Sequence, residues 1–154
     1  MKTLLISFAG FFLFSACSNN KPPNLPDFGE TKPLEGTYWM LTELNGQLVA
    51  APKDGAKPSF IYFNAETKRV AASGGCNVMG GSYELMDGNR IKFGQMISTR
   101  MACPDMTNEE GLTSMAGMVD NYAIQGDNLM FAKARMAPTA RFKAVAAPVG
   151  FKAN

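Results

Sequence analysis

Short runs in which apolar and polar residues alternate follow one another along most of the chain. Alternation over four to eight residues is typical of a β-strand with one buried face. Asn45-Gly46 and Asp87-Gly88 are strong hairpin signals, because both residues of each pair tolerate positive φ. We expect about eight of ten such runs to form short strands. The runs lie at 37–44, 47–49, 59–64, 69–72, 82–86, 89–93, 96–101, 122–124, 129–134 and 140–145.

One segment has a helical period instead. Its apolar residues repeat at i, i+3, i+4 and i+7, and they are Leu112, Met115, Ala116 and Val119. The preceding sequence, Thr107-Asn108-Glu109-Glu110, matches a capping box, in which the Thr107 hydroxyl and the Glu110 side chain bond each other's amides. We therefore predict an α+β fold: a strongly curved, half-barrel-like antiparallel sheet closed by one α-helix, whose stripe packs into the concavity of the sheet.

The first 33 residues differ in composition from the rest. Lys2 and the apolar run that follows it end at Ser15-Ala16-Cys17, which indicates a signal peptide over 1–16 and resembles a bacterial lipobox. We expect Cys17 to be lipidated; the alternative is a secreted soluble protein in which Cys17 is free or absent. Residues 17–33 carry repeated prolines and predict a tether. The domain is predicted over 34–146, with a frayed tail at 147–154.

Composition excludes several kinds of site. The chain of 154 residues contains no histidine, which excludes a Ser-His-Asp triad, a Cys-His dyad and most zinc-enzyme sites. Its formal net charge of +2 gives no reason to expect nucleic acid. Its eleven methionines are consistent with soft core packing, or with an adaptable apolar binding surface.

Two cysteines flank the hairpin at Asp87-Gly88. Cys76 follows two glycines, which permit a tight corner, and Cys103 precedes a proline, which favours an extended backbone. Export would place both in an oxidising compartment, so we predict a Cys76–Cys103 disulfide. The alternative is a pair of buried or reactive thiols. A metal site is not expected, because two thiolates without a histidine leave a tetrahedral ion short of ligands.

Three sequence stretches also resemble a known signature. Gly75-Cys76-Asn77, Gly81-Ser82-Tyr83 and residues 98–104 (Ser-Thr-Arg-Met-Ala-Cys-Pro) are similar to the motifs of META/HslJ-like domains, which are common in bacterial envelope lipoproteins. The resemblance spans about residues 34–145. It implies a half-barrel-like α+β fold, a role in stress or antibiotic tolerance, and a similarity to secretion-pilot lipoproteins that hold an acyl chain or peptide. It implies no chemical reaction.

Candidate binding residues come from the same stretches. Arg100 could bind an anion, or could bond backbone carbonyls of the Gly-Gly-Cys-Asn corner; Asn77 has the same two interpretations. Asp105, with Glu109 and Glu110, could suggest acid–base chemistry, but acidic residues in the first turn of a helix favour a role in complementing its dipole.

Two function classes remain. We expect a non-enzymatic lipoprotein, anchored in the outer membrane and facing the periplasm, that binds a partner protein or an apolar ligand. The alternative is an envelope enzyme with a site around Arg100, Asp105 and Tyr83. We expect no cofactor, no metal, no nucleic acid partner and a monomer. The residues expected to line a binding groove are Trp39, Tyr62, Phe63 and Met101.

Overall fold

The computed structural model describes residues 30–53 and 55–152, and this part of the chain holds ten strands and one helix. The predicted signal peptide and Cys17 lie outside it. The elements are β1 (Tyr38–Leu44), β2 (Gln47–Leu48), β3 (Phe60–Asn64), β4 (Arg69–Ser73), β5 (Val78–Met86), β6 (Arg90–Phe93), β7 (Ile97–Ser98), α1 (Thr107–Met118), β8 (Asn121–Gln125), β9 (Asn128–Ala132) and β10 (Ala140–Val145).

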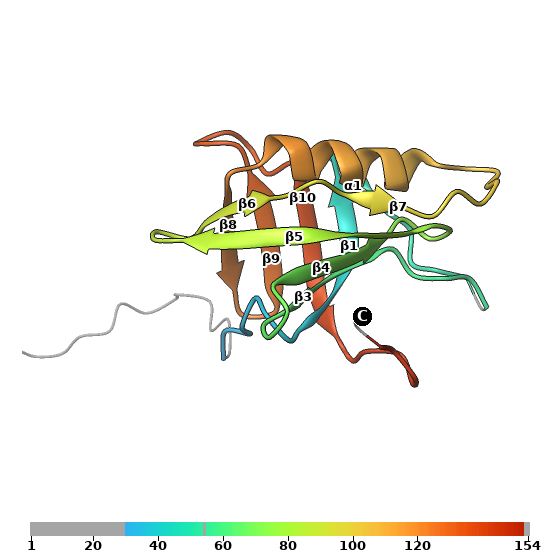
Figure 1. The fold of residues 1–154 in the computed structure, drawn as a ribbon, viewed down its shortest axis with the longest axis horizontal. Coiled ribbons are helices and arrows are strands. Elements are labelled where there is room, and N and C mark those ends of the chain that lie inside the picture. The colour runs from blue at the N-terminus through green and yellow to red at the C-terminus, as the bar shows by residue number, and fades with distance from the viewer. Residues whose placement is uncertain (1–29, 54, 153–154) are drawn as a thin grey trace, which may run out of the picture.

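All pairings between these strands are antiparallel, and eight of the strands form a closed barrel (Figure 1). Their order is β10-β9-β8-β6-β5-β4-β3-β1, and β1 pairs with β10 to complete the ring. The two-residue strands β2 and β7 add to β1 and β5. The prediction of an antiparallel sheet with one helix is confirmed. The sheet goes further than the expected half-barrel, because closure gives β1 and β10 a partner on both sides.

The pairings between neighbouring strands of the barrel differ in length. β1 and β10 pair from Tyr38↔Val145 to Leu44↔Ala140, with one bulge between Leu41 and Glu43. β6 and β8 share a single register pair, Arg90↔Asn121. One backbone bond on each side supports that pair: the Ile91 amide donates to the Asp120 carbonyl at 3.1 Å, and the Tyr122 amide donates to the Asn89 carbonyl at 2.9 Å. Beyond this point β6 and β8 separate.

The barrel interior is the hydrophobic core. Alternate residues of each long strand point inward, and those completely shielded from solvent are Trp39, Phe63, Leu129 and Phe131. The Trp39 indole donates to the Leu34 carbonyl at 2.9 Å, so the one polar atom of that ring is satisfied. Methionines occur in both expected settings: Met79 and Met115 are buried, whereas Met118 and Met136 are exposed.

Helix α1 lies across one end of the barrel (Figure 1) and packs on β1, β4 and β6. The predicted stripe is confirmed, because Leu112, Met115, Ala116 and Val119 are all buried. The prediction that Thr107 and Glu110 form a capping box is wrong. In the described structure Met106 is the N-cap residue and its side chain makes no capping hydrogen bond. Thr107 is already helical, and its amide donates to Asp105 Oδ1 at 2.9 Å in a tight turn. The helix is too short and too polar to cross a membrane.

The tail departs from the prediction of a frayed end. The ring of Phe151 packs edge-on against the outward-facing aromatic rings of β1 and β3. Its centroid lies 5.0 Å from that of Tyr38, 5.5 Å from that of Phe60 and 5.2 Å from that of Tyr62. Edge-to-face geometry of this kind is favourable for aromatic pairs, so the described part of the tail covers an apolar cluster outside the barrel.

Candidate functional site

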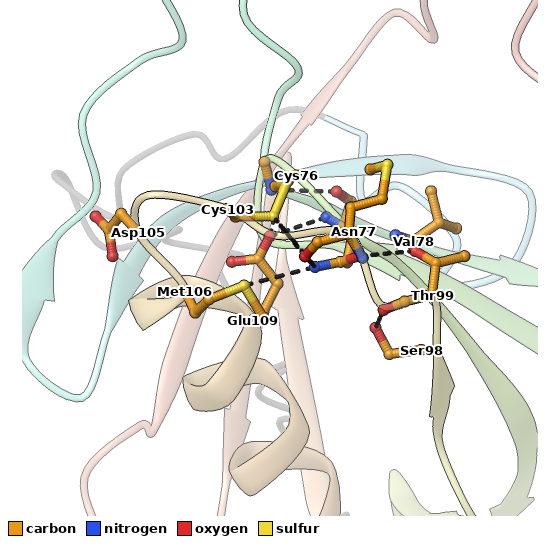
Figure 2. The surroundings of a disulfide bond; sticks show 12 residues. Cys76, Asn77, Val78, Ser98, Thr99, Cys103, Asp105, Met106 and Glu109 are labelled. Atoms are coloured by element: carbon orange, nitrogen blue, oxygen red, sulfur yellow. Dashed lines mark hydrogen bonds between the residues drawn. A yellow bond between two sulfur atoms is a disulfide. The ribbon is translucent and has the colours of Figure 1, made fainter.

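The predicted disulfide is present. Cys76, in the corner between β4 and β5, is bonded to Cys103, in the segment that leads from β7 to α1 (Figure 2). The two α-carbons are 6.4 Å apart, within the range of about 4.4–6.8 Å that disulfides occupy. Gly75 beside it has a φ of 118°, which only glycine adopts without strain. Gly75 therefore allows the tight turn in which Cys76 reaches Cys103.

Asn77 fastens the same segment by hydrogen bonds. Its side chain is fully buried. Its Oδ1 accepts from the Thr99 hydroxyl at 2.9 Å and from the Met101 amide at 2.8 Å, and its Nδ2 donates to Cys103 Sγ at 3.3 Å. Because its donors and acceptor are used inside the protein, the structure favours the structural interpretation of Asn77 over a ligand-binding one.

Glu109 is the residue that sequence reasoning missed. It was assigned to the helix dipole, yet its side chain is only 4% exposed and points from α1 to the corner (Figure 2). Its Oε1 accepts from the amide of Cys76 at 2.8 Å and from that of Asn77 at 3.1 Å. The signal was Gly74: a Cβ there would lie 2.6 Å from Glu109 Oε2, so this glycine leaves room for the carboxylate.

The sulfur atoms of the disulfide and a carboxylate oxygen of Glu109 all lie within 4.8 Å of one another. A cleft of about 350 Å³ opens beside them, and we call it the disulfide cleft; Asp105 and Lys57 also line it. Hydrogen bonds from the Thr107 hydroxyl and amide hold the pKa of Asp105 below its usual value. Asp105 points away from the disulfide (Figure 2), so it belongs to the rim of the cleft.

The residues of the predicted enzyme site are not brought together. Asp105, Arg100 and Tyr83 line three different clefts. The Tyr83 hydroxyl donates to Glu35 Oε1 at 2.5 Å, and burial together with that carboxylate raises its pKa above its usual value. Arg100 is exposed, and among the described residues its side chain makes no hydrogen bond to the corner.

Two further hollows lie on the surface of the described domain, and the first has mainly apolar walls. The first, which we call the helix groove, has a volume of about 490 Å³ and lies between β6 and the C-terminal half of α1, at the weak β6–β8 pairing. Phe93, Met96 and Val119 contribute apolar surface, and Arg90 and Lys92 carry positive charge. The second is a shallow hollow of about 660 Å³ beside β7, lined by Ile97, Arg100 and Met101.

The predicted set of groove-lining residues is wrong for the most part. Trp39 and Phe63 are shielded inside the core, because they face inward from β1 and β3. Tyr62 faces outward and contacts Phe151. Met101 alone of the four lines a described hollow, the one beside β7. The period-2 pattern identified strand faces, but it could not separate a filled interior from an open concavity.

Comparison with known proteins identifies the domain. The META domain family model matches residues 32–146. Two NMR structures share the fold: a protein from Burkholderia xenovorans, with 24% sequence identity over 82% of this chain and 100% of that one, and a second protein, with 23% identity over 71% and 90%. Both have a TM-score of 0.57. The comparison with curated proteins finds no match.

Proposed function

Because the chain belongs to the META domain family, we propose that it is a non-enzymatic lipoprotein of the bacterial cell envelope, and that the helix groove holds the apolar part of its ligand. The groove lies where the ring of strands is weakest, between β6 and α1. It combines apolar walls with a cationic rim, and ligand pockets in proteins commonly pair apolar walls with a few polar groups at fixed places.

The state of the signature residues supports binding over catalysis. The side chain of Asn77 and the Oε1 atom of Glu109 make internal hydrogen bonds, and the two cysteines are joined to each other. Tyr83 donates to Glu35 inside the domain. Groups engaged in this way stabilise a scaffold and are poorly placed to exchange protons with a substrate.

The rim indicates the kind of ligand. Arg90 and Lys92 lie on β6 beside the groove, whereas Lys133 on the same rim is paired with Asp120 at 3.2 Å. An apolar chain with an anionic head group, or an apolar segment of a partner protein with an acidic flank, would complement this surface. We propose the first of these as the simpler ligand to test.

A groove-filling variant tests the proposal. Apart from its chain neighbours and the nearby backbone of α1, no described atom lies within 4 Å of a Cβ built on Gly117, so Gly117→Trp would place an indole in the open space next to the groove. Ser114→Trp is the matched control, since Ser114 is exposed on α1 and does not line the groove. We expect dodecanoate, below its micelle concentration, to shift NMR signals of β6 and α1 in the wild type and in Ser114→Trp. The proposal fails if Gly117→Trp responds in the same way, or if no variant responds.

The envelope location needs a separate measurement. We expect mass spectrometry of the mature protein from membranes to show an N-terminus at Cys17 with added acyl mass, because two acyl chains give stable membrane anchoring. A role in stress or antibiotic tolerance predicts that cells lacking the protein become more sensitive, and that a Cys17→Ser variant does not restore resistance. An unmodified N-terminus elsewhere would contradict the anchor and would leave the binding test unaffected.

A further inference from the structure

Three groups that bind metal ions converge at the disulfide corner from three segments of the chain. Cys76 comes from the β4–β5 corner, Cys103 from the segment before α1, and Glu109 from the first turn of α1. Their sulfur and oxygen atoms lie within 4.8 Å of one another. We propose that when the disulfide is reduced, the two thiolates and the Glu109 carboxylate bind a zinc-type divalent cation.

Glu109 is already oriented for this role. Its Oε1 accepts from the amides of Cys76 and Asn77, which fixes the carboxylate in the corner and leaves Oε2 for another partner. Hydrogen bonds that orient a ligating side chain before the metal arrives are a regular part of metal sites. Gly74 supplies the space, since a side chain there would collide with Glu109 Oε2.

The backbone spacing permits the sulfurs to separate around an ion. In a tetrahedral zinc site each Zn–S bond is about 2.3 Å, which places two sulfurs roughly 3.8 Å apart. The α-carbons of Cys76 and Cys103 are 6.4 Å apart, near the wide end of the range of disulfides, so rotation of the side chains suffices. The disulfide cleft, lined by all three ligands, provides access, and water from it would fill the fourth position.

Charge makes a cation the natural partner of the reduced corner. Two thiolates beside a carboxylate repel one another, and a divalent cation bound between them offsets that repulsion. Reduction by a dithiol transfers two electrons and two protons to the disulfide, giving two thiols here and a disulfide in the reductant. Binding of the divalent ion then releases two protons, so the apparent affinity rises with pH.

The buried Glu109 changes the sequence-based expectation that this corner would bind no metal. Two cysteines without a histidine left the ion short of ligands, but the buried Glu109 supplies an oxygen that the sequence pattern assigned to the helix dipole. Two sulfurs and one oxygen suit a zinc-type ion. Cu⁺ prefers soft sulfur ligands and would have no need of Glu109, so this residue distinguishes the two metals.

Titration with Co²⁺ as a spectroscopic probe tests the site. The mature protein is reduced with a phosphine under anaerobic conditions, and the oxidised protein serves as its reference. We expect the reduced wild type to bind one Co²⁺ with a thiolate charge-transfer band that Zn²⁺ displaces, and the oxidised protein to show no band. Glu109→Gln should weaken Zn²⁺ binding about tenfold or more. Glu110→Gln, which neutralises an exposed neighbour, should retain the wild-type affinity.

A measurement on the wild type protects the test against poor folding of the variant. Zn²⁺ should slow alkylation of Cys76 and Cys103 in the reduced protein and should raise its unfolding temperature. The proposal is overturned if no thiolate band develops, if Zn²⁺ gives no protection, or if Glu109→Gln, folded by circular dichroism, binds Zn²⁺ as the wild type does. Binding of Cu⁺ with the same affinity in Glu109→Gln and wild type, without Zn²⁺ binding, would also overturn it.

Discussion

The two ends of α1 are held by different means. At the N-terminal end, Glu109 is buried under the corner, the disulfide ties the preceding segment to the corner between β4 and β5, and Gly111 packs directly on Leu44. At the C-terminal end, Gly117 faces open space and Met118 is 45% exposed. The same helix is thus a fixed part of the corner at one end and a wall of the helix groove at the other.

The difference teaches where this fold can tolerate change. Buried hydrogen bonds and close backbone contacts make the first end sensitive to single atoms, since each orphaned polar group and each clash costs free energy. The second end has unfilled space next to it and only one register pair between the neighbouring strands β6 and β8. Local opening should therefore begin at the helix groove and reach the corner last.

The largest expected effect is that of Glu109→Ala. Removal of the carboxylate leaves the part-buried amide of Cys76 and the buried amide of Asn77 without their acceptor. Hydrogen bonds to charged groups contribute about 1.5–3 kcal/mol each, so the free energy of unfolding should fall by about 3–6 kcal/mol in urea titrations. Glu110→Ala, at an exposed position of the same turn, should change it by less than about 0.5 kcal/mol. If the free energy of unfolding fell equally in the two variants, the proposal that buried hydrogen bonds hold the N-terminal end of α1 would be contradicted.

The disulfide should come next. Its cysteines are separated by 27 positions, and closing a loop of that length stabilises by about 3–4 kcal/mol in the chain-entropy model. The double variant Cys76→Ser/Cys103→Ser should lose that amount, measured by thermal and urea unfolding of the oxidised proteins. Metal-free wild type reduced with a phosphine should unfold at nearly the same denaturant concentration as the double variant. A loss below about 1 kcal/mol would show that Asn77 and Glu109 hold the corner without the bond.

The two helix glycines should respond with opposite signs. Alanine is favoured over glycine in a helix interior by about 1 kcal/mol, so Gly117→Ala, in the last turn of α1, should stabilise the domain by up to about that amount. A methyl group on Gly111 would collide with the Leu44 side chain, so Gly111→Ala should destabilise by about 1–3 kcal/mol. Thermal unfolding of the pair compares the ends of α1 directly. Stabilisation by both substitutions would show that the Leu44 side chain moves aside for the methyl group on residue 111 at little cost in free energy.

The smallest expected effect is the pH dependence of stability that Asp120 contributes next to the C-terminal end of α1. Hydrogen bonds from the Ala134 amide and the Asn121 side chain, with Lys133 adding less, lower the pKa of Asp120 to about 2. A lowered pKa stabilises the folded state above the ordinary carboxyl value near 4, and that contribution is lost as the pH falls from about 4 to about 2. Asp120→Asn should remove this part of the acid sensitivity in unfolding measurements, whereas Asp87→Asn, in an exposed turn, should retain it.

Local patterns predicted the local structure. The hairpins at Asn45-Gly46 and Asp87-Gly88, the alternation along the strands and the buried stripe of α1 all depend on residues within a few positions of one another. The pairing of β1 with β10 joins residues about a hundred positions apart, and no short-range signal specifies it. The Cys76–Cys103 pair was predictable because few cysteines were available.

The position of Glu109 could not be read from the chain. Its neighbours suggested an exposed helical start, and the contact with the corner exists only because β4 and β5 meet the first turn of α1. Gly74 carried the one hint, and it was indistinguishable from the turn glycine Gly75 until the backbone angle was known. When a buried polar side chain such as Glu109 contacts a segment far away in sequence, the signal in the sequence is the small residue that makes room for it, here Gly74.

The point where the chain enters the barrel has a mechanical consequence. The Lys32 amide donates to the Gly126 carbonyl, the Trp39 indole donates to the Leu34 carbonyl, and Glu35 accepts from Tyr83 while it pairs with Lys68 at 2.7 Å. A pulling force applied through the residues before Lys32 would load these bonds before it reached β1. Since β1 is itself held on both sides by β3 and β10, the load would be shared across two ladders, and the domain should resist unravelling from that end.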